Sequence, residues 1–138
     1  MPKITLTIAS RLEDVSLVGG AVRGLCEAAS LPPPDVFQIE LAVVEALNNI
    51  IYHAYQNRPE HQVSLTWILA NGGLRIEISD QGQAMMTRPD GNMPEALQEN
   101  GRGWPIMMAC MDQVEYYSNN GLNTLILIKQ LPNHLATG

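Results

Sequence analysis

Five short stretches of the chain have the residue pattern of β-strands. In Ile4 to Ile8, and again in Leu74 to Asp80, apolar and polar residues alternate, which predicts strands with one buried face. Turn-forming segments join two pairs of the stretches, so we expect two hairpins in the part of the chain that follows Val63. The other three predicted strands are Val63 to Ile68, Gln113 to Ser118 and Asn123 to Leu131.

Helical spacing of apolar residues predicts helices between these strands. Apolar residues from Val15 to Leu25 recur every three or four positions, and Ser10 with Glu13 forms the S-x-x-E pattern of a capping box that would open this helix. A second helix is predicted from Asp35, which follows three prolines, to about Ala54. A short third helix is predicted at Pro105 to Met111, with proline at its first position.

The order of these elements predicts the fold class. Strands and helices form separate runs, so we expect an α+β fold: a two-layer α/β sandwich with a mixed, mostly antiparallel sheet and helices on one face. Residues 1–131 are expected to form a single domain and residues 132–138 a frayed tail. Residues 81–103 show no sustained periodicity, and a loop of that length inside a compact domain is usually functional.

Composition narrows the class of protein. Hydrophobic residues make up 46% of the chain and charged residues 16%, which is typical of a globular domain. The formal net charge of −6 makes contact with phosphate backbones unfavourable, so we expect no direct nucleic-acid binding. Cys26 and Cys110 lie in apolar stretches and are expected to be buried, reduced thiols. The sequence has neither the pattern of a signal peptide nor an apolar run of the ~20 residues that a membrane span needs, which predicts a cytoplasmic protein without a membrane partner.

The second predicted helix carries polar residues within an otherwise apolar sequence. Glu45, Asn49 and His53 are four residues apart and therefore fall on one side of the helix, with Asn48 beside them. A carboxylate and an amide that face the interior without partners cost roughly 1–3 kcal/mol each. Either this strip faces solvent or a ligand satisfies it.

Two glycine-containing segments favour the ligand. Asp80-Gln81-Gly82 ends a predicted strand and places a carboxylate beside a residue that lets a ligand approach the backbone. Gly101-Arg102-Gly103 opens the third predicted helix, where unpaired backbone amides can bind an anion. Each segment alone occurs often by chance, but the ordered set of three is far more specific.

The ordered set resembles the nucleotide-binding motifs of the GHKL ATPases, in the form used by bacterial anti-sigma factors that are serine-protein kinases. Glu45 to Tyr55 resembles the N-box, Asp80 to Ala84 the first glycine box, and Gly101 to Met107 the second glycine box. The order and spacing of the motifs agree with this family from the first predicted strand to about Leu131. It implies the Bergerat-type ATP-binding fold and a site for ATP and Mg²⁺.

The resemblance also implies a role for each motif residue. Asn49 would coordinate the Mg²⁺ that bridges the ATP phosphates, and Glu45 would act as general base toward a serine hydroxyl. Asp80 would accept a hydrogen bond from the adenine amino group, and Gly82 would let the base approach closely. Thr124 is a further candidate for the adenine pocket. The phosphates would be held by the second glycine box, which contains Gly101, Arg102 and Gly103.

Enzymes of this family bind a sigma factor and hold it inactive, and they phosphorylate a serine of a STAS-domain anti-anti-sigma protein. The resemblance therefore implies a homodimeric protein serine kinase that works by partner switching. Two alternatives stay open: a nucleotide-binding module that sequesters its partner with little phosphotransfer, and the ATP-binding module of a sensor histidine kinase. The base Glu45 argues against the first, and the lack of an upstream phosphoacceptor histidine argues against the second.

A few residues depart from the family pattern or have a packing explanation. Ala84 replaces a glycine, Pro105 removes a backbone donor at the third helix, and Asn48 replaces a smaller side chain. These three changes leave room for weak nucleotide affinity or a slow kinase. Packing roles are expected for His53, Trp67, Trp104, Met107, Met108 and Met111, and an adaptable contact surface for Met85, Met86 and Met93.

Overall fold

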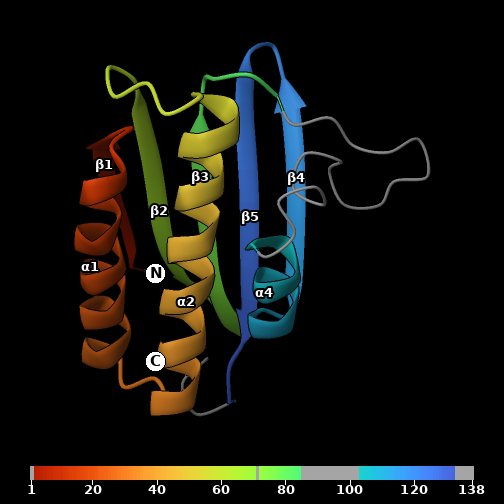
Figure 1. Ribbon diagram of the computed structural model, residues 1–138. Helices are drawn as coiled ribbons and strands as arrows, with labels where there is room; N and C mark the ends of the chain where they lie inside the picture. The colour runs from red at the N-terminus through yellow and green to blue at the C-terminus, as the bar shows by residue number, and fades with distance from the viewer. Residues whose placement is uncertain (1, 71, 85–102, 133–138) are drawn as a thin grey trace.

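The computed structural model describes residues 2–70, 72–84 and 103–132, which form one sheet with helices on one side (Figure 1). This two-layer arrangement confirms the predicted α+β sandwich. Residues 133–138 of the predicted tail and most of the predicted loop, including all three of its methionines, lie outside the described residues. The strands are β1 (Lys3–Ala9), β2 (Gln62–Ala70), β3 (Gly73–Asp80), β4 (Gln113–Asn119) and β5 (Leu122–Gln130); the helices are α1 (Val15–Ala28), α2 (Pro33–Asn49) and α4 (Gly103–Cys110), with short helical turns η1 (Leu12–Asp14) and η2 (Ile50–Ala54).

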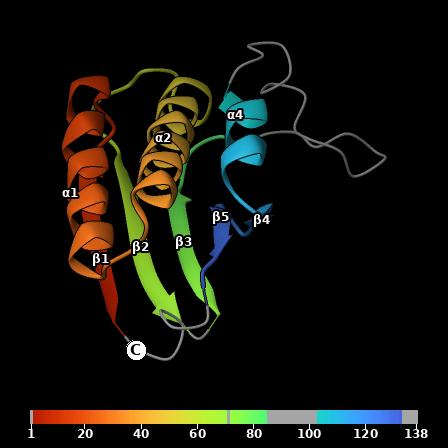
Figure 2. The ribbon, with the colours of Figure 1, turned by 90° about the horizontal axis from the view of Figure 1, so that it is seen from below.

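The described strands form a sheet in the order β1-β2-β3-β5-β4, and all four neighbouring pairs are antiparallel. The predicted mixed character is therefore not seen among these strands. Two helices, α1 and α2, separate β1 from β2. The first runs away from the end of β1 and the second returns to it, so β2 starts near that end and runs antiparallel to β1 (Figure 1). Viewed from below, all the described helices cover the same face of the sheet (Figure 2).

The core lies between the sheet and the helices. Leu74, Ile76 and Ile78 alternate along β3 with less buried residues, as the sequence predicts, and all three are fully buried. Burial of each such side chain stabilises the fold by about 1.5–3 kcal/mol. Trp67, Trp104 and the two free cysteines are buried as well, which confirms the expected packing of these residues.

The start of α1 differs from the prediction. Ser10 is buried and does not cap the helix; its hydroxyl donates to the carbonyl of Arg58 and accepts a hydrogen bond from the backbone N–H of His61 at 3.2 Å. The helix begins only at Val15, after the turn η1, and neither segment has a side-chain cap. The capping-box prediction is wrong because a distant loop, which the local S-x-x-E pattern cannot reveal, engages the serine hydroxyl.

The second helix covers the predicted range but ends in an unusual turn. It begins at Pro33, two residues before the predicted start, and remains α-helical to Asn49. Residues Ile50–Ala54 then form a π-helical turn, closed by the hydrogen bond from the Tyr55 N–H to the Ile50 carbonyl at 3.3 Å. Single π turns inside helices often mark functional sites.

The third helix, α4, begins at Gly103, two residues before the predicted start at Pro105. Met107 and Met111 are buried, as expected for core residues, but Met108 is 53% exposed and its predicted core role is wrong. The helix is apolar on all sides, so helical spacing alone does not identify which methionines face inward. Within the described residues, none of the helices combines the length and apolar character needed to cross a membrane.

Candidate functional site

The polar strip of the second helix lies at its C-terminal end, at the edge of the core. Glu45, Asn48 and Asn49 are all partly exposed, while their neighbours Ala46 and Leu47 are fully buried. The side-chain nitrogen Nδ2 of Asn49 is buried and has no hydrogen-bond partner among the described residues. An amide atom in that condition costs about 1–3 kcal/mol. The site therefore contains a polar side chain that a bound ligand would satisfy.

The π turn changes where the last motif residue points. Because this turn contains an extra residue, His53 does not continue the row of Glu45 and Asn49 as it would in a regular helix. The His53 ring packs edge-on against Tyr52, with ring centroids 4.8 Å apart. This contact supports the packing role expected for His53.

Gly82 packs against the end of the π turn. A Cβ atom on Gly82 would lie 2.5 Å from the carbonyl oxygen of Ala54 and 2.8 Å from Cδ1 of Tyr55. The same Ala54 carbonyl accepts a hydrogen bond from the N–H of Gln83 at 2.8 Å. A glycine is needed here because the segment after β3 lies directly on η2, a requirement that the sequence could not distinguish from close approach of a ligand.

Tyr55 connects the same two segments through its hydroxyl. This hydroxyl accepts a hydrogen bond from the N–H of Gln81 at 2.8 Å and donates one to the carbonyl of Gln62 at 2.7 Å. Its ring stacks on His61, with centroids 4.6 Å apart and an interplanar angle of 9°. The end of η2, the end of β3 and the start of β2 are thereby held as one unit.

We expect Gly82→Ala to destabilise the fold by about 1–3 kcal/mol, because the added methyl group overlaps the Ala54 carbonyl and the backbone must shift. Urea denaturation would measure the loss as a lower midpoint. Gly24→Ala is the matched control: a Cβ at Gly24 meets nothing within 4 Å in α1, so the change should raise stability by about 0.5–1 kcal/mol. Equal midpoints for Gly82→Ala and the wild type would contradict the packing role of Gly82.

Asp80 is a buried carboxylate at the end of β3, with 3% of its surface exposed. Its Oδ1 atom accepts hydrogen bonds from the N–H of Gly82 at 2.9 Å and from Nδ2 of Asn123 at 2.8 Å. Burial raises the pKa of the Asp80 carboxyl, and these two hydrogen bonds partly oppose the increase. Because both bonds use Oδ1, a ligand donor would meet the other oxygen, Oδ2.

Asn123 is a site residue that the sequence did not reveal. Its Nδ2 bonds both Asp80 and the carbonyl of Gly82, the latter at 3.0 Å, and its Oδ1 accepts from Ser118 at 2.7 Å. Asn123 is opposite Asp80 in the β3–β5 pairing and is buried. In the sequence, alternation places Asn123 on the same strand face as Leu125 and Leu127. Only the strand register shows that this position is opposite Asp80.

Thr124, by contrast, does not join this group. It is opposite Ser79 in the register, and successive residues of a strand point to opposite faces of the sheet. Thr124 therefore lies on the sheet face away from the helices, while Asp80 and Asn123 lie on the helix side. The structure does not bring Thr124 together with the other predicted adenine residues.

The second glycine box is described only in part. Gly103 is the first residue of α4, so its position at a helix start agrees with the prediction, while Gly101 and Arg102 lie outside the described residues. Trp104 and Met107 are buried and belong to the core cluster that includes the apolar residues of α2. The structure thus places Gly103, Asn49 and Glu45 on two neighbouring helices (Figure 2).

The residues present are suited to a magnesium nucleotide. The described residues contain no group of three or more His, Cys, Asp and Glu side chains that could hold a metal ion by themselves. Mg²⁺ commonly keeps most of its waters and takes one or two protein oxygens together with substrate phosphates. Asn49 fits such a site, because its side-chain oxygen Oδ1 is a suitable ligand for Mg²⁺ and its unpartnered donor Nδ2 could bond a phosphate oxygen.

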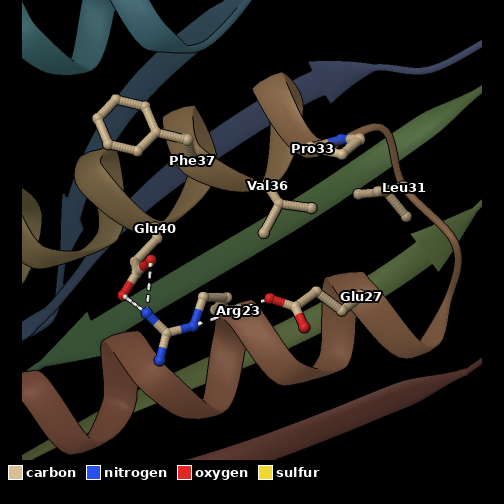
Figure 3. A pocket seen from close by; sticks show the side chains of 7 residues that line it. All are labelled: Arg23, Glu27, Leu31, Pro33, Val36, Phe37 and Glu40. Atoms are coloured by element: carbon tan, nitrogen blue, oxygen red, sulfur yellow. Dashed lines mark hydrogen bonds and ion pairs between the residues drawn. The ribbon is translucent and has the colours of Figure 1, made fainter.

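A separate hollow of about 330 Å³ lies between the second half of α1 and the first half of α2 (Figure 3). Arg23 lies between two carboxylates there, 3.3 Å from Glu40 and 3.9 Å from Glu27, and Val36 forms part of the apolar wall. None of the motif residues that the structure describes lines this hollow, so it is distinct from the polar strip.

Comparison with known proteins identifies the type of domain. Residues 8–129 match the protein family described as the histidine kinase-like ATPase domain. The chain belongs to this family. The match spans both predicted glycine boxes and the N-box, and it confirms the resemblance found in the sequence.

Relatives of this ATPase domain include two kinds of bacterial regulator. The anti-sigma F factor of Bacillus cytotoxicus is 32% identical over 108 residues, covering 74% of each chain. The serine-protein kinase RsbW of Listeria monocytogenes is 24% identical over 133 residues, covering 90% of this chain and 85% of that protein. Within its family, this ATPase domain groups with the anti-sigma factors and RsbW-type kinases.

Solved structures support the fold of this ATPase domain. A structure of RsbU and RsbW domains from Mycobacterium tuberculosis matches with a TM-score of 0.71 at 18% identity, covering 95% of this chain and 33% of that one. A SiaB–SiaC complex from Pseudomonas aeruginosa matches with a TM-score of 0.66 at 11% identity, covering 91% and 88%. At these identities the likeness establishes the architecture alone.

Proposed function

We propose that this protein is an anti-sigma factor with serine-protein kinase activity: it binds Mg·ATP, sequesters a sigma factor, and phosphorylates a serine of a STAS-domain antagonist. The observation that carries the proposal is the placement of Glu45 and the unpartnered amide of Asn49 on one side of α2 beside α4. The named relatives, an anti-sigma factor and a serine-protein kinase, support the same function. We further propose that the protein is cytoplasmic and works as a homodimer.

In the proposed site each motif residue has one task. The Oδ2 atom of Asp80 accepts a hydrogen bond from the adenine amino group, while Oδ1 stays bonded to Asn123 and Gly82. Asn49 supplies a side-chain oxygen to Mg²⁺. The amide of Gly103, at the start of α4, is free of an intrahelical partner and can donate to a phosphate oxygen.

Phosphotransfer then requires a base beside the incoming serine. Glu45 lies one helical turn before Asn49, so its carboxylate is placed to take the proton of the serine hydroxyl. The serine Oγ forms a bond to the γ-phosphorus as the bond from that phosphorus to the β–γ bridging oxygen breaks, and ADP leaves. When bound, Mg²⁺ neutralises the charge on the phosphates.

Sequestration without phosphotransfer is the competing function, and the same assay separates the two. A STAS-domain protein from the same organism would be incubated with Mg·ATP and the kinase, and intact mass would record phosphate addition. Addition of one phosphate supports the proposal. Nucleotide binding without phosphate addition would instead favour a sequestration module, and the absence of nucleotide binding would contradict the central claim.

Asn49→Ala is expected to lower the affinity for Mg·ATP at least about 10- to 100-fold, because even the side chains that only orient metal ligands typically contribute that much. The phosphotransfer rate at subsaturating ATP should fall by the same factor. Isothermal titration calorimetry with and without Mg²⁺ would measure the change. Asn48→Ala is the matched control, since it removes the same side chain from the adjacent position of α2. Equal losses from both substitutions would contradict a specific role for Asn49.

A further inference from the structure

Lys129 is a buried lysine to which the proposed function assigns no role. It lies on β5 and is 9% exposed. Along this strand it alternates with Ile128 and is in line with Leu125 and Leu127, so its side chain enters the layer between the sheet and the helices.

The ammonium group of Lys129 joins two helices. Its Nζ donates a hydrogen bond to Oε1 of Gln38, in α2, at 2.5 Å. It donates a second hydrogen bond to the backbone carbonyl of Cys110, the last residue of α4, at 2.6 Å. A cation at this position also interacts favourably with the partial negative charge at the C-terminal end of a helix.

No carboxylate among the described residues forms an ion pair with Lys129. A buried charge without a counter-ion contributes little to stability, and an apolar side chain of similar volume often stabilises such a position as well or better. A requirement for stability alone therefore does not explain a lysine at this place in the core.

The apolar contacts that pack α4 into the core are not directional. Trp104 and Met107 are buried in the core cluster, but apolar contacts depend mainly on buried area and define the position of a helix along its axis only loosely. The two hydrogen bonds of Lys129 have defined partners and geometry, so they fix the C-terminal end of α4 relative to α2.

The two helices carry their motif residues at the opposite ends. Figure 1 shows α2 and α4 running in opposite directions, so that Asn49 and Gly103 lie toward one end of the pair and Gln38 and Cys110 toward the other. At 1.5 Å per residue, Gln38 lies about 17 Å from Asn49 along α2, and Cys110 about 10 Å from Gly103 along α4. A contact that fixes one end of the pair therefore sets the spacing at the other.

We propose that Lys129 is a positioning residue for the nucleotide site: by tying α2 to α4 at one end, it holds Asn49 and Gly103 at the spacing that a bound nucleotide requires. This inference rests on the nucleotide binding proposed above, but not on the identity of the protein substrate. Without the two hydrogen bonds of Lys129, only a fraction of the molecules has Asn49 and Gly103 at the spacing that binds nucleotide. The apparent dissociation constant for the nucleotide then rises by the inverse of that fraction. Saturating nucleotide restores the competent spacing, so kcat is retained.

Lys129→Met tests this role, because methionine has a similar length and no charge. We expect the Kd for Mg·ADP and the KM for Mg·ATP to rise about tenfold, which corresponds to a competent fraction of about one tenth, with kcat within about twofold of the wild type. The urea midpoint should stay equal or rise. Lys3→Met is the matched control, since Lys3 is the only other lysine and is exposed on β1.

Two results would overturn the proposal: a Kd within twofold of the wild type, or a fall in kcat and urea midpoint that accompanies the weaker binding, which indicates a purely structural role. Gln38→Leu provides a second test that keeps the lysine and removes only the α2 arm; it too should raise Kd and KM without lowering kcat, and unchanged binding would contradict the proposal. A wild type that binds no nucleotide would contradict the proposed function itself, whereas normal binding by both variants contradicts only the role of Lys129.

Discussion

Glu45→Gln is expected to reduce the rate of serine phosphorylation about 10²- to 10⁴-fold, which is the usual contribution of a general base. Glutamine keeps the size and hydrogen-bonding capacity of the side chain but cannot accept the serine proton. The Kd for Mg·ATP should stay within about threefold of the wild type, because the proposed contacts to the nucleotide come from Asn49, Asp80 and Gly103 rather than from Glu45.

Rapid-quench measurement of phosphoserine formation, at saturating nucleotide and antagonist, would give the single-turnover rate of this variant. Glu40→Gln is the matched control: it makes the same chemical change five residues earlier in α2, where Glu40 pairs with the exposed Arg23. Loss of that ion pair should cost at most about 1 kcal/mol and leave the rate unchanged. A Glu45→Gln rate near that of the wild type would exclude Glu45 as the base.

Asp80→Asn should lower nucleotide affinity at least about 1,000-fold, since sites built around a buried hydrogen bond reject a mismatched group by factors of that order or more. An asparagine can keep its Oδ1 bonded to Gly82 and Asn123, as Asp80 does. Its NH₂ group would then take the place of Oδ2 and would face the adenine amino group, so that two donors meet and no hydrogen bond forms.

Stability should respond in the opposite direction, which separates the loss of binding from unfolding. Burial raises the pKa of the Asp80 carboxyl, so the folded state holds this proton more tightly than the unfolded chain. The associated stability is present below the unfolded pKa of about 4 and is lost as the pH rises through the folded value. Asparagine does not titrate, so Asp80→Asn does not lose this contribution as the pH rises. The urea midpoint of the variant minus that of the wild type should therefore increase between about pH 4 and pH 7.

The measurements are urea titrations at several pH values and calorimetric titration with Mg·ADP. Asp112→Asn is a suitable control, because Asp112 is exposed just before β4 and lies outside the three motifs. A variant with unaltered affinity would exclude Asp80 as the acceptor for the base, and a constant midpoint difference across the pH range would contradict the raised pKa.

The sequence predicted the elements of the fold well because each depends on local patterns. Alternation identified β3, apolar spacing identified α1 and α2, and the turn residues Asn120 and Gly121, which adopt φ of 54° and 81°, identified the second hairpin. The three motifs of the candidate site were likewise visible as short segments. Their arrangement on two adjacent helices and one strand end agrees with the family fold.

What the sequence did not reveal depends on contacts between distant segments. The choice between Asn123 and Thr124 depends on the register of β5 against β3, where a shift of one residue exchanges the two faces of the sheet. The burial of Ser10 depends on the loop at Arg58, and the need for glycine at position 82 depends on the π turn of η2. None of these contacts leaves a local pattern.

The pairing of β1 with β2 has a consequence for how the chain can acquire its structure. Lys3 is opposite Ile68 in this pairing, and β2 is the only described strand next to β1. During synthesis, β1 can therefore pair only after α1 and α2 have been synthesised. Closure of so long a loop is slow compared with formation of the two hairpins, whose partners are close in sequence. Until β2 has left the ribosome, the apolar faces of α1 and α2 have no sheet to pack against. Fragments that end before Gln62 would therefore expose those faces to solvent and tend to aggregate rather than fold.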